Sequence, residues 1–228
     1  MTSDGTNQQS ILKHPAVPWV TPFLAFVAIL SISDYLHFLG RWEYPLRCGF
    51  LTAVIYHFSR RVLSFRVVSW TGSIGLGVAV FVLWIDPDLL FPGYRQLFSG
   101  TVLGTLKSSL PSEYHADPMV LFFRTVRAAL LVPILEELFW RGWLMRYLIK
   151  PDFLSLPLGA YSRSAFWITA VLFALEHGVF WDVGLACGLI YNWWMVRTRS
   201  LGDLILVHAV TNACLSFYVI WAKQWQYW

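Results

Sequence analysis

The feature that most limits the fold of this chain is a series of long apolar runs separated by short polar or basic segments. A helix of about 20 predominantly apolar residues is what crosses the bilayer core. Charged residues make up 13% of the 228 residues, against about 25% in soluble domains, while 57% are hydrophobic. So little charge leaves too little polar surface to cover a water-soluble protein. The chain is therefore predicted to be a multi-pass membrane protein, and its 13 Trp and 10 Tyr are typical of membrane interfaces.

We expect an all-α, multi-pass transmembrane helical bundle of about 7–8 membrane helices. The predicted spans are Trp19–Leu39, Tyr44–Phe58, Val67–Ile85, Met119–Ile149, Ser164–Phe180, Val183–Val196 and Leu201–Trp221. In the more polar stretch Asp86–Pro118, residues Tyr94–Leu110 are predicted to form an interfacial or re-entrant helix. Residues 1–18 are expected to be a disordered N-terminus, and 19–228 a single helical domain. The polar start lacks the basic region of a cleaved signal peptide, so the first apolar run is expected to be retained.

The basic residues orient the predicted helices, because short cytoplasmic loops are rich in Lys and Arg. The connections after the second, fourth and sixth spans are basic, and they carry Arg60, Arg61, Arg66, Arg146, Lys150, Arg163, Arg197 and Arg199. This pattern predicts a protein of the cell (inner) membrane with a cytoplasmic N-terminus and an outer C-terminus. Arg41 and Arg47, in the predicted outer first loop, do not fit the pattern.

The net charge of +4 does not indicate nucleic-acid binding, because the basic residues form no continuous patch. The three cysteines, Cys48, Cys187 and Cys214, lie in or beside apolar runs without CxxC spacing. They therefore indicate neither a disulfide framework nor a thiolate metal site.

Two adjacent carboxylates in the fourth predicted helix are candidate functional groups, since ionisable groups at membrane depth are costly. Glu137 and Arg141 have the i, i+4 spacing of a helical ion pair. Glu136 is rotated by about 100° on the helix and is then free to face a cavity, where it could act as a general base. A purely structural salt bridge is the alternative for Glu137 and Arg141.

Histidines lie in the fifth and seventh predicted helices. His177, four residues after Phe173 and next to Glu176, could be a hydrogen-bonded core residue or a catalyst. His208 and Asn212 share one helix face and could stabilise an oxyanion or form polar contacts between helices. Glu136 and His177 each lie 13 residues from the ends of antiparallel predicted helices, which predicts a common depth of about 20 Å. This match requires the fourth helix to continue past Arg141.

The ordered motifs Glu136-Glu137…Arg141, Phe173…His177 and His208…Asn212 resemble the EExxxR, FxxxH and HxxxN pattern of the CPBP intramembrane proteases. That family includes the type II CAAX prenyl endopeptidases and the Abi proteins. The length and the abundance of Trp also resemble the CAAX-protease-like proteins that accompany exosortase systems. Glu176 is not part of the family pattern.

The resemblance implies a glutamate-dependent intramembrane endopeptidase without a cofactor. Glu136 and His177 would activate water, His208 and Asn212 would form the oxyanion hole, and Glu137 and Arg141 would shape and neutralise the site. The expected partners are a membrane-anchored protein or peptide substrate, the lipid bilayer and exosortase-system proteins, with no nucleic acid. A carboxylate and two histidines could instead hold zinc, although HExxH spacing is lacking.

Two other function classes would also explain the same polar residues. A membrane scaffold, immunity or regulatory protein would keep the polar cluster for packing or partner binding. A transporter would use it as a proton relay, but the chain has no inverted-repeat pattern.

Overall fold

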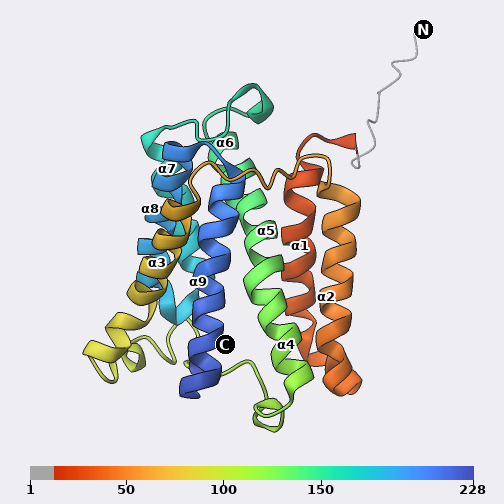
Figure 1. Cartoon of the computed structure of the whole chain (residues 1–228), viewed down its shortest axis with the longest axis vertical. Helices are drawn as coiled ribbons and strands as arrows, with labels where there is room; N and C mark the ends of the chain where they lie inside the picture. Colours follow the sequence, from red (N-terminus) through yellow and green to blue (C-terminus); the bar gives the residue numbers. More distant parts are fainter. Residues whose placement is uncertain (1–12) are drawn as a thin grey trace, which may run out of the picture.

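The apolar runs form helices that lie side by side along one axis, as the computed structural model shows for residues 13–228 (Figure 1). The predicted disordered N-terminus falls mainly on residues 1–12, which lie outside the described residues; α1 begins at Val17. The prediction of an all-α fold is confirmed. Throughout residues 13–228, the β-pairing is limited to one isolated bridge between Thr101 and Gly104.

The elements follow one another in this order, with η marking 3₁₀ or π segments: α1 (Val17–Ser31), η2 (Ser33–Trp42), α2 (Glu43–Val54), η3 (Ile55–Ser59), α3 (Trp70–Leu90), η4 (Tyr94–Leu97), η5 (Ser112–Tyr114), α4 (Pro118–Val126), η6 (Arg127–Leu131), α5 (Val132–Glu137), η7 (Leu138–Leu144), α6 (Met145–Tyr147), η8 (Phe153–Ser155), α7 (Arg163–Glu176), η9 (Gly178–Phe180), α8 (Trp181–Thr198), α9 (Leu201–Ala222) and η10 (Trp225–Tyr227). The elements from α4 to α6 form one helix, Pro118–Tyr147. The fourth predicted helix therefore does continue past Arg141.

Four helices of the described chain are long and apolar enough to cross a membrane: Trp70–Leu90, Pro118–Tyr147, Gly178–Thr198 and Leu201–Ala222. A fifth span is added if the segments Val17–Ser31 and Ser33–Ser59, bent by 88°, count as one. The chain is thus a multi-pass membrane protein. The predicted number of about 7–8 membrane helices is approximate. It counts α7 and the helices α1 and α2, on either side of the 88° bend, as separate spans, and each of these is shorter than a full span.

Two predicted helices differ from the structure. The first span, Trp19–Leu39, ends at Ser31, and the remainder lies in the bent segment η2. There Asp34 and His37 are exposed and lie 3.7 Å apart, so these ionisable groups leave the span. The predicted helix Tyr94–Leu110 is wrong, because helical structure there is confined to η4. Gly93, Gly100 and Gly104 all have positive φ, which interrupts a right-handed helix.

The long helix and α9 lie in the middle of the bundle, with α1 and α2 on one side and α3, α7 and α8 on the other (Figure 1). The main apolar core joins all these helices through residues such as Leu51, Leu135, Leu138, Tyr191 and Leu204. The connections 60–69, 148–162 and 199–200 lie at the same end of the bundle as the start of α1 (Figure 1). We call this the basic end, because these connections carry Lys and Arg residues that orient the predicted helices.

A buried carboxylate fixes the basic end. Asp203, in the first turn of α9, accepts hydrogen bonds from the backbone N–H groups of Val68 (2.6 Å) and Ser69 (2.9 Å). It also accepts one from the Ser73 hydroxyl (2.8 Å). These groups belong to the start of α3, whose first N–H groups have no partner within the helix. Asp203 therefore joins α3 to α9 and gives the N-terminus of α3 a favourable negative charge.

We expect Asp203→Ala to lower the free energy of unfolding by about 1–3 kcal/mol, because it leaves two partly buried N–H groups and the buried Ser73 hydroxyl without their acceptor. The melting temperature of the purified protein in a mild detergent measures this effect. Asp152→Ala, at an exposed position of the same end, is the matched control and should leave the melting temperature nearly unchanged. A loss of equal size in both variants would contradict the interpretation.

Candidate active site

A pocket of about 180 Å³, which we call the polar pocket after its Glu, His and Asn side chains, lies between α3, the long helix, α7, α8, α9 and the segment after α9. Five of the seven residues named by the sequence motifs line it: Glu136, Phe173, His177, His208 and Asn212. Its other lining residues are Trp84, Ala128, Val132, Cys187, Tyr191, Thr211, Leu215, Ser216, Tyr227 and Trp228. The volume is enough for several water molecules. Three separate stretches of sequence therefore meet at one cavity.

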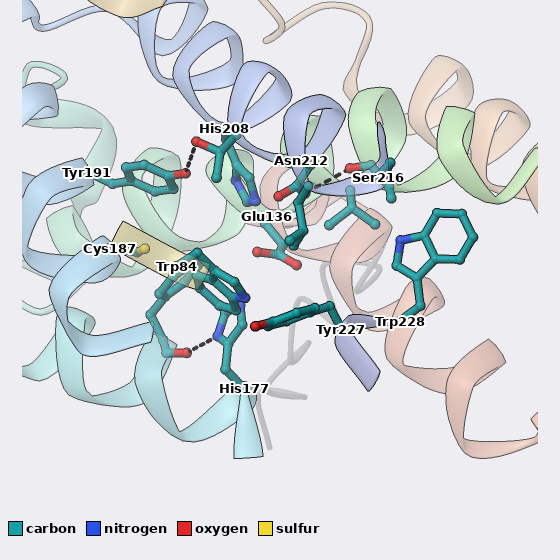
Figure 2. A pocket seen from close by; sticks show the side chains of 15 residues that line it. Trp84, Glu136, His177, Cys187, Tyr191, His208, Asn212, Ser216, Tyr227 and Trp228 are labelled. Atoms are coloured by element: carbon teal, nitrogen blue, oxygen red, sulfur yellow. Dashed lines mark hydrogen bonds between the residues drawn. The ribbon is translucent and has the colours of Figure 1, made fainter. Parts of the chain in front are cut away.

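Glu136 supplies the carboxylate of this pocket. It lies on the long helix, about 17 Å from the helix end at Tyr147 at 1.5 Å per residue. Its side chain is buried, and its Oε2 atom has no hydrogen-bond partner among the described residues. Figure 2 shows the carboxylate between His208 and Asn212 on one side and His177 and Tyr227 on the other. A buried oxygen without a partner beside a cavity is a position for a bound water.

Glu137 faces away from the pocket and interacts with two basic side chains. Its two oxygens accept hydrogen bonds from Nη1 of Arg141 at 3.1 and 3.2 Å. Its Oε1 also accepts a hydrogen bond from Nδ1 of His208 at 2.9 Å. This carboxylate therefore orients the imidazole, and Nε2 of His208 is left to face the pocket.

Arg141 is fully buried behind the pocket, with partners on several helices. Its Nε donates to Oδ1 of Asn192 (2.8 Å), and the Nδ2 of that asparagine donates to the carbonyl of Phe166 (2.8 Å). The guanidinium also lies over the ring of Phe173, 4.5 Å from its centroid. Phe173 in turn packs against both histidines, with ring centroids 4.6 Å from His177 and 6.4 Å from His208. Neither Arg141 nor Glu137 lines the pocket itself.

His177 lies just past the end of α7, whereas the sequence predicted it inside a helix reaching Phe180. Its Nδ1 donates to the carbonyl of Phe173 (2.7 Å), which leaves Nε2 as an acceptor. The helix ends here because Gly178 has φ +55°, a conformation that favours glycine. A Cβ at position 178 would also meet the carbonyl oxygen of Leu103 at 2.7 Å. His177 is therefore held by a backbone hydrogen bond at a fixed turn.

A stripe of polar side chains on α9 forms one wall of the pocket. His208, Asn212 and Ser216 follow one another at intervals of one turn. The Asn212 amide donates one hydrogen bond to the carbonyl of Ala128 (2.9 Å), so its orientation is fixed across the two central helices. Nδ2 has a second hydrogen that this bond does not use. The Ser216 hydroxyl is buried and has no partner among the described residues.

Several pocket residues were not found from the sequence. Ser216 continues the i, i+4 spacing of His208 and Asn212, so the same periodicity could have indicated it. Tyr191, whose hydroxyl donates to Thr211 (3.0 Å), had no such signal on α8. Glu176, next to His177, is exposed and does not line the pocket. Trp84 and Tyr227 come from segments outside the three motifs.

The pocket side chains do not form a metal-binding arrangement. Within residues 13–228, no group of three or more His, Cys, Asp or Glu side chains is placed to hold a metal ion. Nδ1 of each histidine already has a protein partner, and the Glu137 carboxylate is engaged with Arg141 and His208. The Nε2 atoms are the ones left to face the pocket, and they do not come together with a carboxylate as a metal site among these residues.

Arg141→Met should lower the free energy of unfolding by about 3–5 kcal/mol, because it leaves the Glu137 carboxylate buried without its main counter-charge. The double variant Glu137→Gln/Arg141→Met removes both charges and should recover much of this loss. Melting temperatures in detergent measure the recovery, with Arg197→Met, at an exposed position on α8, as the control. A double variant whose loss equals the sum of the two single losses would show that the pair does not interact.

Comparison with known proteins agrees with the motifs. Residues 118–214 match a family model described as type II CAAX prenyl endopeptidase Rce1-like. No curated protein and no solved structure matches the chain. The matched residues contain all three motifs and run from the start of the long helix into α9. The narrower resemblance to exosortase-associated proteins stays a prediction. The resemblance to the CAAX protease family is thus confirmed over residues 118–214, the part of the chain that carries the polar pocket.

Proposed function

We propose that this chain is a glutamate-dependent intramembrane endopeptidase that cleaves a peptide bond of a membrane-associated protein or peptide. The family match supports an endopeptidase of the CAAX-protease-like kind in general. The finer proposal depends on one observation: Glu136, His177, His208 and Asn212 line a single polar pocket within the helical bundle. A general base and oxyanion donors must converge on one small volume for peptide hydrolysis.

In the proposed mechanism, a water between Glu136 and His177 is the nucleophile. The Oε2 atom of Glu136 has no other partner, so it can accept the proton of this water. Nε2 of His177 accepts the second hydrogen of the water and orients it, because its Nδ1 is engaged with the Phe173 carbonyl. The water oxygen then adds to the scissile carbonyl carbon. The tetrahedral oxyanion then re-forms the carbonyl as the C–N bond breaks, and Glu136 transfers its proton to the leaving amine nitrogen.

His208 and Asn212 are proposed to stabilise the negative charge that develops on the carbonyl oxygen. Both are held in place before substrate binds, His208 by Glu137 and Asn212 by the Ala128 carbonyl. Since Nδ1 of His208 is engaged by Glu137, this role requires the doubly protonated imidazolium, whose Nε2–H donates into the pocket. Donors fixed in advance need no reorganisation during the reaction.

The alternatives have less support. A zinc-dependent protease needs three converging protein ligands, and no such group is placed together within residues 13–228. A scaffold or regulatory protein has no need for a buried carboxylate oxygen without a partner, which is costly where it has no function. We therefore keep a metal-independent mechanism as the main proposal.

We further propose that the basic end faces the cytoplasm, which gives a cytoplasmic N-terminus in the cell (inner) membrane. The concentration of Lys and Arg in the connections at this end supports this orientation. Exosortase-system proteins stay proposed partners, on the resemblance of the sequence alone.

Glu136→Gln should abolish processing while the protein keeps its fold, since the amide has nearly the same shape but cannot accept the proton. Comparison of the membrane proteome of cells that carry either form should show an uncleaved precursor only with the variant. Glu113→Gln, at an exposed position outside the pocket, is the matched control and should process normally. A scaffold would give no precursor in either variant.

Once a precursor is identified, a chelator added to the purified protein separates the two hydrolytic mechanisms. Cleavage by activated water without metal should persist. Loss of cleavage that is restored by zinc would overturn the metal-independent proposal.

Asn212→Ala should lower the cleavage rate by about 10²–10³-fold, the usual cost of removing one oxyanion donor. The loss should appear in kcat more than in KM, because the interaction is strongest in the transition state. Cys214→Ala, on the same helix but outside the pocket, is the control. An unchanged kcat in folded Asn212→Ala would remove Asn212 from the mechanism.

A further inference from the structure

A second cluster of charged residues lies away from the pocket, where the start of α2 packs against α4 and η6. It contains three arginines: Arg47 on α2, Arg124 on α4 and Arg127 in η6. Their charges interact with one another. The thiol of Cys48 donates to the Phe123 carbonyl (3.2 Å) and fixes the two helices together here. Both helices begin at the end of the bundle opposite the basic end (Figure 1).

The cluster has more positive than negative charge. Glu43 forms an ion pair with Arg47, and this is the one ion pair that the three arginines make within residues 13–228. Arg124 has uncharged partners, the Ser109 hydroxyl (2.6 Å) and the ring of Trp228. Arg127 has neither an ion-pair partner nor a side-chain hydrogen bond among residues 13–228. Three guanidinium groups thus share one carboxylate.

Some N–H groups of the cluster are buried without a partner. The Nε atoms of Arg47 and Arg124 have no acceptor in the described chain, and both side chains are more than nine-tenths buried. A buried, charged donor without an acceptor is costly. An oxyanion from outside the chain would satisfy these donors, and a planar guanidinium matches the geometry of a phosphate or carboxylate.

An apolar groove of about 280 Å³ adjoins the cluster between α1, η2 and α2. Glu43 and Arg47 line its polar part, and the remaining lining residues are Ile29, Ile32, Leu36, Leu39, Leu46 and Phe50. A groove for a hydrocarbon chain next to unneutralised arginines fits an amphiphile with an anionic head. A free inorganic anion would leave the groove unexplained.

The depth of the cluster fits the lipid headgroup region. Arg47 and Arg124 lie about 6–9 Å from the first residues of α2 and α4, at 1.5 Å per residue. The adjoining segment η2 exposes Tyr35, Phe38 and Trp42, as side chains at a membrane interface do. Arg127 lies about 14 Å from the start of α4, one turn deeper than Arg124. This range of depths fits phosphate groups and the upper acyl chains, with Arg127 reaching toward the headgroup from below.

We propose that Arg47, Arg124 and Arg127 bind the phosphate of an anionic phospholipid, whose acyl chain lies in the groove lined by Leu39, Leu46 and Phe50. This site also accounts for Arg47, which does not fit the orientation of the other basic residues. The lipid supplies the missing negative charge and joins α1, α2 and the long helix at this end. The site is independent of peptide hydrolysis in the pocket.

The test uses the full chain, purified in an uncharged detergent, with phosphatidylglycerol, phosphatidylcholine of the same acyl chains and inorganic phosphate as separate probes. Native mass spectrometry counts bound lipid, and the melting temperature reports stabilisation. Phosphatidylglycerol should bind about tenfold more tightly than phosphatidylcholine. Equal binding of the two lipids would overturn the proposal, and so would equal stabilisation by inorganic phosphate, which would indicate a site for a free anion.

Arg127→Gln should weaken phosphatidylglycerol binding by about tenfold, because it removes one charge-assisted contact. Leu46→Trp should weaken it by filling the groove. Arg197→Gln, at an exposed arginine on α8, and Leu175→Trp, at an exposed leucine on α7, are the matched controls and should bind as the unchanged protein does.

If Arg127→Gln fails to fold, Arg127→Lys keeps the charge but loses the planar donors and should show an intermediate loss of binding. Unchanged binding in folded Arg127 and Leu46 variants would overturn the proposal.

Discussion

The interaction on which the pocket depends is the contact of one buried carboxylate, Glu137, with Arg141 and His208. In the low dielectric of a membrane bundle, none of these groups is tolerable without the others. Arg141 extends the network through Asn192 to the backbone of α7, so four helices share it. This network fixes the orientation of the imidazole at the pocket wall. It also leaves the neighbouring Glu136 without a protein partner for one oxygen, and therefore available to a ligand.

Two further polar networks hold the ends of the same helices. At the basic end, Asp203 joins α9 to the start of α3. At the other end, Asp88 of α3 accepts from Arg95 (3.0 Å) and from the Tyr227 hydroxyl (2.7 Å), and Arg95 also pairs with Asp182 of α8. Apolar side chains give little preference for one arrangement of helices in lipid, because lipid tails are equally apolar. The position of the pocket is therefore determined mainly by these polar contacts.

Local patterns in the sequence predicted much of this arrangement. Apolar runs predicted the positions of most helices. The i, i+4 spacing indicated both the Glu137–Arg141 pair and the shared face of His208 and Asn212. Contacts between distant segments could not be predicted in this way. No local pattern places Tyr227 in the wall of a pocket formed by Glu136, or links Arg141 to Asn192. The bend after Ser31 and the end of α7 before His177 depend on how these segments pack. The apolar runs continue past both points, so the predicted helices are longer than the observed ones.

The contact of Gly178 with Leu103 links the membrane-embedded histidine to the polar connection between α3 and α4. The carbonyl of Leu103 lies against the backbone one residue after His177, where a methyl group would not fit. Any side chain at position 178 would separate the two surfaces. Residue 178 is therefore restricted to glycine by the space beside a single backbone oxygen, and that oxygen belongs to a segment more than seventy residues earlier in the chain.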